Sequence, residues 1–163
     1  AVEWCTKSAE QGYAYAQYDL GGMYENGLGV AKDYKKAVEW YIKSAEQGNA
    51  NAQYNLGVMY YNGLGVEKDD KKAFKWFTKS AEQGNANAQY NLGSMHGLEM
   101  DYKKAVEWYT KSAEQGNANA QFNLGFMYSK GLGVEKDHEK AFEWYTKSAE
   151  QGYVKAKEAL KLF

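Results

Sequence analysis

The chain has 163 residues, a net charge of −1 and an isoelectric point near 6.2. This balanced charge provides neither a polyanion-binding surface nor a polybasic membrane patch, so we expect no nucleic acid partner. No apolar run approaches the roughly 18–20 residues that span a bilayer, so we expect no membrane insertion. Cys5 is the single cysteine, which excludes an intrachain disulfide.

One phrase, Lys-Ser-Ala-Glu-Gln-Gly, occurs five times, at residues 7–12, 43–48, 79–84, 111–116 and 147–152. Successive copies start 36, 36, 32 and 36 residues apart. A period of this length is typical of solenoid proteins, in which one packing unit stacks on the next. An enzyme has no use for five near-identical copies of its catalytic group, so the repetition favours a binding function.

Residues 1–12 are the end of such a unit, because Ala1–Trp4 has the same sequence as Ala37–Trp40. The chain therefore starts inside a repeat, and we expect it to be a fragment. It contains no signal peptide, and its compartment stays open. The apolar face of this half-unit is partly uncovered, so an upstream repeat or a second copy of the chain is expected to cover it.

The helix that begins at Tyr34 illustrates the second helix of each A–B pair, which we call helix B. It is predicted to start at Tyr34, with Asp33 as its N-cap. Its packing stripe consists of five residues at helical spacing: Ala37, Trp40, Tyr41, Ser44 and Ala45. Gly48 is expected to end the helix in a left-handed conformation, which costs glycine little.

Another helix, helix A, is predicted over Ala50–Tyr61, with Asn49 as its N-cap. Its packing stripe consists of Ala52, Leu56, Gly57 and Tyr60. Glycine inside a helix costs about 1 kcal/mol relative to alanine, so Gly57 predicts a close approach of the partner helix. Residues 62–69 link helix A to the next helix B, and their two glycines allow a tight reversal.

The whole chain is predicted to be all-α, with about ten helices in antiparallel pairs that form a single repeat domain. No segment shows the period-two alternation of a β-strand. The expected units are residues 1–12 (partial), 13–48, 49–84, 85–116, 117–152 and 153–163. The last of these is expected to be a polar capping helix.

The third full unit is shorter than the others, because Met95–Asp101 has four residues fewer than Met59–Asp69. Aligning Gly97 with Gly63 places His96 at the position of Tyr60. This alignment predicts that helix A ends early in this unit and lacks counterparts of Tyr61 and Asn62. The deletion has two interpretations, a ligand-binding notch with His96 at its edge and a merely tolerated loss, and we favour the second.

The repeated residues resemble the Sel1-like repeat family, a branch of the tetratricopeptide superfamily, over almost the whole chain. In one unit the motif is carried by Leu56-Gly57, Tyr60, Gly63-Leu64-Gly65-Val66, Asp69, Ala73, Trp76-Phe77 and Ala81-Glu82-Gln83-Gly84. The resemblance implies a right-handed α-solenoid, with the A helices lining its concave face, and an adaptor that holds partner proteins. One cysteine-rich branch, linked to β-lactam binding, closes each pair with a disulfide. The paired cysteines are missing here, so that activity is not expected.

The face of helix A opposite its packing stripe is predicted to line a groove for a partner protein or peptide. The candidate residues are Tyr15, Tyr18, Gly22, Glu25, Asn26, Asn51, Tyr54, Val58, Tyr61, Asn62, Asn87, Tyr90, Ser94, Asn119, Phe122, Phe126, Ser129 and Lys130. Asparagine amides can hydrogen-bond an extended peptide backbone, and tyrosine supplies rigid contact area. Tyr54, Tyr90 and Phe122 have the alternative of packing between neighbouring helices.

Two rows of this face vary between otherwise similar repeats. One row contains Gly22, Val58, Ser94 and Phe126, and the other contains Glu25, Tyr61 and Ser129. We interpret these as positions that the scaffold does not dictate. Selection by a ligand and neutral drift both explain the variation.

The predicted function is a non-enzymatic scaffold for protein–protein interaction. Alternatives are a structural or oligomerising element that acts through its ends and, less favoured, an RNA-binding helical repeat, against which the balanced charge counts. We predict no catalytic residue, no cofactor and no metal site. His96 and His138 are the only histidines, and no three or four metal ligands converge.

Overall fold

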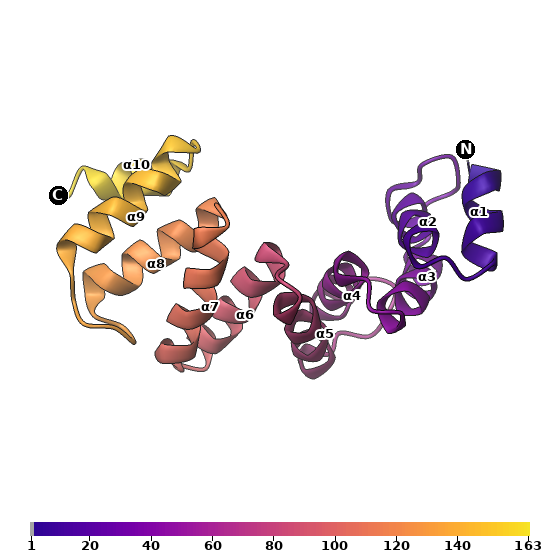
Figure 1. Ribbon diagram of the computed structural model, residues 1–163, viewed down its shortest axis with the longest axis horizontal. Helices are drawn as coiled ribbons and strands as arrows, with labels where there is room; N and C mark the ends of the chain where they lie inside the picture. Colours follow the sequence, from indigo (N-terminus) through magenta and orange to yellow (C-terminus); the bar gives the residue numbers. More distant parts are fainter. Residues whose placement is uncertain (1) are drawn as a thin grey trace. The chain divides into compact units, whose positions relative to one another are not determined.

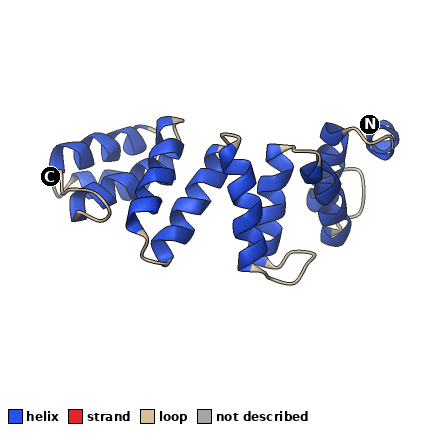
Figure 2. Cartoon of the chain, turned by 60° about the horizontal axis from the view of Figure 1, so that its bottom comes forward, coloured by secondary structure: helices blue, strands red, loops and turns tan. Residues whose placement is uncertain are grey.

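The computed structural model describes residues 2–163, which form ten α-helices and no β-strand (Figures 1 and 2). The B helices are α1 (Val2–Glu10), α3 (Tyr34–Glu46), α5 (Asp70–Glu82), α7 (Tyr102–Glu114) and α9 (His138–Glu150). The A helices are α2 (Ala14–Asn26), α4 (Ala50–Asn62), α6 (Ala86–Leu98), α8 (Ala118–Lys130) and α10 (Val154–Leu160). The prediction of an all-α fold of repeated helix pairs is confirmed.

The helices are grouped in two compact units, one that ends at Asn85 and one that begins at Ala86. The first unit contains α1 to α5 and the second contains α6 to α10, and within each unit every helix packs against the next in the chain (Figure 1). The arrangement of the whole chain as one domain, with the expected repeat boundaries, stays a prediction.

The helix ends lie where the capping residues predict. The Asp33 carboxylate accepts a 3.1 Å hydrogen bond from the backbone N–H of Lys36, and the Asn49 side chain accepts one of 2.9 Å from that of Ala52. Asp69, Asp101 and Asp137 cap the other long B helices in the same way. Helix α3 is followed by Gly48 with a φ of 93°. The N-caps and the glycine ending of the repeat are therefore confirmed.

The core of each pair is made by the predicted stripes, with small changes. Ala37, Tyr41, Ser44 and Ala45 of α3 are buried, as are Ala52, Leu56 and Gly57 of α4. Met59 is buried where Tyr60 was expected, and Trp40 is only half-buried. A Cβ atom on Gly57 would lie 2.6 Å from Cδ1 of Phe77. The close approach that this glycine allows is therefore made by an aromatic ring of α5.

The repeated phrase forms a polar network between consecutive helices. The Ser80 hydroxyl donates to the carbonyl of Ala50 at 2.7 Å, and the Gln83 amide donates to the Gln53 side-chain oxygen at 2.7 Å. Gln53 in turn donates to the carbonyl of Ala45 at 3.1 Å. The two glutamines thus connect α5 to α4 and α4 to α3. Equivalent glutamine pairs are Gln47–Gln17, Gln115–Gln89 and Gln151–Gln121.

The short third unit differs from the prediction that its helix A ends early. Helix α6 has 13 residues, as α4 has, so Gly97 and Leu98 occupy the positions of Tyr61 and Asn62. The N–H of Asp101 donates to the carbonyl of His96 at 2.9 Å, just as the N–H of Asp69 donates to that of Tyr60. This shared hydrogen bond fixes the register, so the four missing residues come out of the linker alone.

Candidate binding surface on the A helices

The predicted binding residues lie at the surface of both units, and none of them is buried. The exposed ones are Tyr15, Asn26, Asn51, Tyr61, Asn62, Asn87, Asn119, Phe126 and Lys130. The half-buried ones are Tyr18, Gly22, Glu25, Tyr54, Val58, Tyr90, Ser94, Phe122 and Ser129. Among the large apolar side chains, Tyr15 is 77% exposed, Phe126 41% and Tyr61 39%. This accessibility meets the first requirement of a binding surface.

One aromatic side chain of each of the four A helices α2, α4, α6 and α8 packs on its partner helix B. The rings of Tyr54 and Phe77 are 6.0 Å apart in α4 and α5, and those of Phe122 and Tyr145 are 5.5 Å apart in α8 and α9. Tyr18–Tyr41 and Tyr90–Tyr109 form equivalent tilted pairs. These rings therefore contribute to the packing between helices, as the alternative interpretation states, and each leaves part of its surface accessible.

Residues of the two variable rows contact the hydroxyl of the aromatic residue on helix B where that residue is a tyrosine. The Tyr41 hydroxyl donates to the Glu25 carboxylate at 2.5 Å, and the Tyr109 hydroxyl donates to the Ser94 hydroxyl at 3.2 Å. The hydroxyls of Tyr145 and Ser129 lie 3.5 Å apart. Phe77 has no hydroxyl, and its repeat carries Val58 and Tyr61 in the two rows. Glu25, Ser94 and Ser129 therefore also take part in helix packing, which explains part of the variation beside ligand selection and drift.

The environment of Tyr41 raises the pKa of its hydroxyl. Burial raises the pKa of Tyr41, and the hydrogen bond and negative charge of Glu25 raise it further. Burial likewise raises the pKa of Tyr109. Both hydroxyls therefore keep their protons, and their hydrogen bonds to α2 and α6, to a higher pH than a free tyrosine would.

Several asparagines of the surface are held by hydrogen bonds within the chain. The Asn51 side-chain oxygen accepts a 3.2 Å bond from the amide of Asn85, and that of Asn87 accepts a 3.1 Å bond from Asn117. Asn62 donates to the carbonyl of Val58, four residues earlier in α4. Because these amides are exposed but oriented, a bound peptide backbone would meet them in fixed positions.

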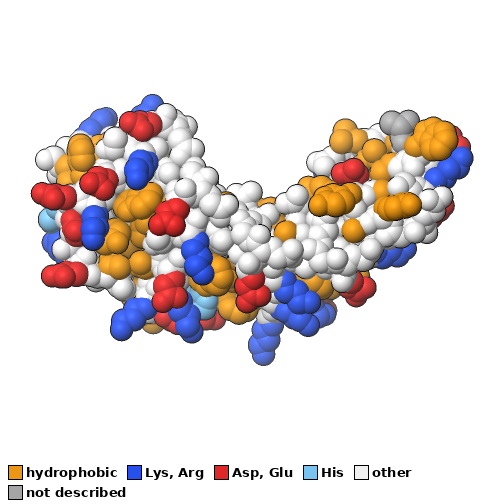
Figure 3. Space-filling view, in the orientation of Figure 1, with side chains coloured by type: hydrophobic (Ala, Val, Ile, Leu, Met, Phe, Trp, Pro, Cys, Tyr) orange, Lys and Arg blue, Asp and Glu red, His pale blue; other side chains and the backbone are white. Residues whose placement is uncertain are grey.

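In the second unit, four predicted residues line a hollow of about 760 Å³ between α8, α9 and α10. These four are Phe122, Phe126, Ser129 and Lys130. The other lining residues are Lys136, His138, Tyr145, Lys155, Glu158, Ala159, Leu162 and Phe163, none of which is among the predicted binding residues. Acidic, basic and hydrophobic side chains are interspersed at the surface of this unit (Figure 3).

The wall of this hollow contains a cluster of aromatic rings. Helix α10 ends at Leu160, and the Phe163 ring packs 5.9 Å from that of Tyr145 and 6.0 Å from that of Phe142. The His138 imidazole contacts the same ring, with centroids 5.8 Å apart. His138 is exposed at the first position of α9 and belongs to this cluster.

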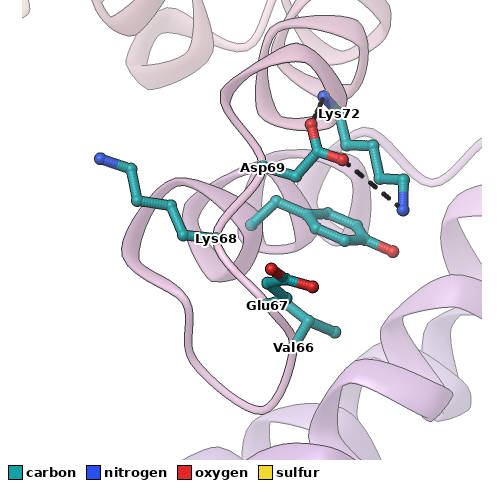
Figure 4. A pocket seen from close by; sticks show the side chains of 6 residues that line it. Val66, Glu67, Lys68, Asp69 and Lys72 are labelled. Carbon is teal, nitrogen blue, oxygen red and sulfur yellow. Dashed lines mark hydrogen bonds and ion pairs between the residues drawn. The ribbon is translucent and has the colours of Figure 1, made fainter.

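A second kind of hollow lies beneath the linker of two repeats. The first, of about 400 Å³, is lined by Tyr60, Val66, Glu67, Lys68, Asp69 and Lys72 (Figure 4). Asp69 caps α5 and forms a 3.6 Å ion pair with Lys72, whose ammonium lies 5.2 Å from the centre of the Tyr60 ring. The equivalent residues from Tyr128 to Lys140 line another hollow of about 430 Å³. Because equivalent residues form this hollow in two repeats, we interpret it as a feature of the repeat fold.

The part of the chain that the structure describes contains no cluster of three or more His, Cys, Asp or Glu side chains suited to a metal ion. Cys5 is half-buried, and its thiol lies 3.4 Å from the carbonyl oxygen of Ala16. Burial and the charge of Asp19 raise the pKa of this thiol, the opposite of what activates a nucleophile. No helix within residues 2–163 has the length and apolar character to cross a membrane.

Helix pairs tied together by a recurring glutamine network define an α-solenoid repeat protein. The chain belongs to the Sel1 repeat family, whose model matches residues 1–13, 14–49, 50–85, 86–117 and 118–153. Proteins of this family are commonly protein-interaction scaffolds and are generally non-enzymatic. A comparison with curated protein sequences gave no significant match.

The structure is similar to several solved Sel1-like repeat proteins. One is c5321, a protective antigen of uropathogenic Escherichia coli, with 48% identity and a TM-score of 0.92 over 98% of this chain. A Sel1 repeat protein from Oxalobacter formigenes has 40% identity and a TM-score of 0.90 over 99%. Cysteine-rich protein B of Helicobacter pylori has 33% identity and a TM-score of 0.51 over 53% of this chain and 65% of its own. The chain spans only 35% of the E. coli protein and 48% of the Oxalobacter protein.

Proposed function

We propose that the chain is a non-enzymatic scaffold that binds a partner protein or peptide on the exposed face of its A helices. The family supports a role in protein interaction. The observation that carries the proposal is the hollow of about 760 Å³, because predicted binding residues from α8 line an open, partly apolar surface there. Pockets of this size that combine apolar walls with a few polar groups are typical binding sites.

The first unit offers a related surface on α2 and α4. Tyr15, Tyr61 and Asn51 are exposed there. Exposed aromatic side chains contribute strongly to interfaces because they bury much area at a small entropic cost. We therefore propose that each unit contributes contacts to the partner.

The test is a selection of peptides from a random display library on the intact chain. Affinities of the selected peptides are then measured for Tyr61→Ala and Phe126→Ala, which remove one exposed aromatic from each unit. At least one of the two substitutions is expected to weaken each peptide roughly tenfold, since aromatic anchors often cost more than 1 kcal/mol on truncation.

Lys75→Ala serves as the matched control, because Lys75 is exposed on the B helix α5. Its affinity for every peptide should equal that of the unsubstituted chain. Selection of no peptide, or peptides that bind the double variant Tyr61→Ala/Phe126→Ala undiminished, would refute the proposal.

A second function, self-association through the first unit, is favoured by the exposure of α1. Trp4 is 78% exposed, whereas its equivalents Trp40 and Trp76 are half-buried. Hydrophobic side chains reach the surface over α1 (Figure 3). Sedimentation equilibrium tests this function: a monomer at every concentration contradicts it, and an oligomer that Trp4→Glu dissociates supports it.

A further inference from the structure

We propose that the hollow between α8, α9 and α10 binds an aromatic side chain that is flanked by carboxylates in an acidic peptide. This inference rests on the proposed function and names the chemistry of its ligand. Two independent features of the hollow support it, an accessible aromatic wall and a set of unpaired lysines.

The aromatic wall offers ring edges and faces to a ligand. Phe126 is 41% exposed and Phe163 is 51% exposed, so both contribute accessible surface to the hollow. Phe163 packs edge-on against Tyr145 with an interplanar angle of 66°. Aromatic rings at 4.5–7 Å attract one another in this geometry beyond their area alone. The wall therefore favours a planar aromatic group over an aliphatic one.

The charge of the hollow is positive. Lys130, Lys136 and Lys155 line it, and Glu158 is its one acidic lining residue. Within residues 2–163 none of these three lysines forms an ion pair with an Asp or Glu side chain. Carboxylates beside the ligand's aromatic ring would pair with ammonium groups that the fold itself leaves uncompensated.

The positive charge arises from two substitutions that occur only in this part of the array. Lys130 stands where α4 has Asn62 and α2 has Asn26, and Lys155 stands where α4 has Asn51 and α8 has Asn119. At each of these two positions an amide is replaced by an ammonium, whereas Lys136 recurs as Lys68 in another repeat. The equivalent positions of α2, α4 and α6 are uncharged, so this pair of ammonium groups is specific to the hollow.

An acidic peptide fits these residues better than a nucleic acid does. Phosphate backbones are bound by extended basic surfaces that neutralise several charges in a row. Here three lysines surround a single hollow that also contains Glu158, and the chain as a whole has a net charge of −1. A short acidic segment with one aromatic residue matches both the size and the charge of the hollow.

The experiment measures fluorescence anisotropy of three labelled peptides with the intact chain. The probe is Gly-Asp-Glu-Phe-Glu-Asp-Gly, and its comparators replace either the acidic residues with serine or the phenylalanine with alanine. We expect the probe to bind at least about tenfold more tightly than either comparator at low salt, and its advantage over the serine peptide to shrink as salt screens the charges.

Variants locate the site. Lys130→Glu with Lys155→Glu is expected to weaken the probe about tenfold or more, because two attractions become repulsions. Phe126→Ala is expected to weaken it roughly three- to tenfold through the lost ring contact. Lys103→Glu, an exposed charge reversal on α7 outside the hollow, should leave the affinity unchanged. Circular dichroism verifies that each variant keeps its helices.

Several outcomes would overturn the inference: equal affinity for all three peptides, indifference to the double charge reversal, or an equal effect of Lys103→Glu. Stronger binding of a labelled oligouridine than of the probe would also overturn it and would point to RNA. The proposed function is judged separately by the unbiased peptide selection. If that selection yields peptides sensitive to Tyr61→Ala or Phe126→Ala but without acidic residues, the scaffold stands and this inference falls.

Discussion

The hydroxyl of Tyr41 donates a 2.5 Å hydrogen bond to the carboxylate of Glu25, and thereby joins α3 to α2. A distance of 2.5–2.7 Å is usual for a hydroxyl that donates to a charged oxygen. In the second unit the Tyr109 hydroxyl donates instead to Ser94, a neutral residue that lies about one turn earlier in its A helix. The A-helix residue at this contact is therefore matched to the aromatic residue of its own helix B.

Tyr41→Phe is expected to lower the free energy of unfolding by about 1 kcal/mol. The substitution removes one charge-assisted hydrogen bond, whose value is reduced because Glu25 is only half-buried. Tyr109→Phe, which loses a longer bond to a neutral partner, should cost about 0.5 kcal/mol. Urea denaturation followed by circular dichroism compares the two. An equal cost would show that the Glu25 charge contributes nothing.

The stability of the protein is expected to fall above about pH 10. The pKa of an unfolded tyrosine is about 10, and the folded pKa of Tyr41 is raised by burial and by Glu25. The folded chain therefore keeps a proton that the unfolded chain loses, so this contribution is complete below pH 10 and is lost as pH rises towards the folded pKa. Each such tyrosine lowers stability by up to about 1.4 kcal/mol per pH unit. Tyr41→Phe should flatten the decline between pH 9 and 11; an unchanged slope would contradict this assignment.

Two adjacent glycines of α2 are expected to respond to alanine in opposite directions. A Cβ on Gly21 would lie 2.6 Å from Cδ1 of Tyr41, so Gly21→Ala should cost about 1–3 kcal/mol by overpacking. A Cβ on Gly22 would have Tyr41 Oη as its nearest neighbour, at an ordinary 3.7 Å. Gly22→Ala should therefore stabilise the helix by about 0.5–1 kcal/mol. Thermal unfolding of the two variants decides this, and stabilisation by both would show that the Tyr41 ring moves aside freely.

The short linker of the third unit contains a strained residue. Met100 has a φ of 60° and is 72% exposed, so a side chain is held in a left-handed conformation without compensating burial. Met100→Gly is expected to raise the free energy of unfolding by about 0.5–1 kcal/mol, since glycine adopts this conformation readily. Met100→Ala keeps the strain and should have almost no effect. If alanine stabilises as much as glycine, the backbone conformation is not the cause.

Removal of a central glutamine of the polar network is expected to destabilise the protein. Gln53 is 4% exposed, accepts from Gln83 and donates to the carbonyl of Ala45. Gln53→Ala removes both of these hydrogen bonds from a buried site and should cost about 1–3 kcal/mol. Gln11 occupies the same place in the repeated phrase as Gln83 and serves as the control. It is exposed, and its side chain forms no hydrogen bond within residues 2–163. Gln11→Ala should change stability by less than about 0.5 kcal/mol. If urea denaturation shows equal losses of stability for Gln53→Ala and Gln11→Ala, the network does not stabilise the packing between helices.

Local features of the repeat were predictable from sequence. The capping role of Asp33 and the close approach at Gly57 follow from short-range rules that act within one helix or one contact. The length of α6 was predicted wrongly, because matching Gly97 to Gly63 ignored the backbone bond from Asp101 to His96. That bond preserves the helix and places the deletion in the linker.

The aromatic hollow was only half predictable. Phe122 and Phe126 were identified from their register on helix A, and the structure places them in the hollow. The contribution of Phe163 was not predicted. The pattern of helix A would have continued through this residue, whereas α10 ends at Leu160. Contacts of this kind depend on where a chain turns in space, which a periodic pattern does not encode.

Gln83 and Gln53 pair within one copy of the repeat, and Gln53 donates to the Ala45 carbonyl of the previous copy. Gln17 and Gln121 donate to Ala9 and Ala113 of their previous copies in the same way. Consecutive copies are consequently joined by the same hydrogen bond wherever this contact occurs. An unequal crossover between two copies of the coding sequence leaves every such joint intact. The array is thereby free to lengthen or shorten by whole units in a single genetic event, with no compensating substitution elsewhere.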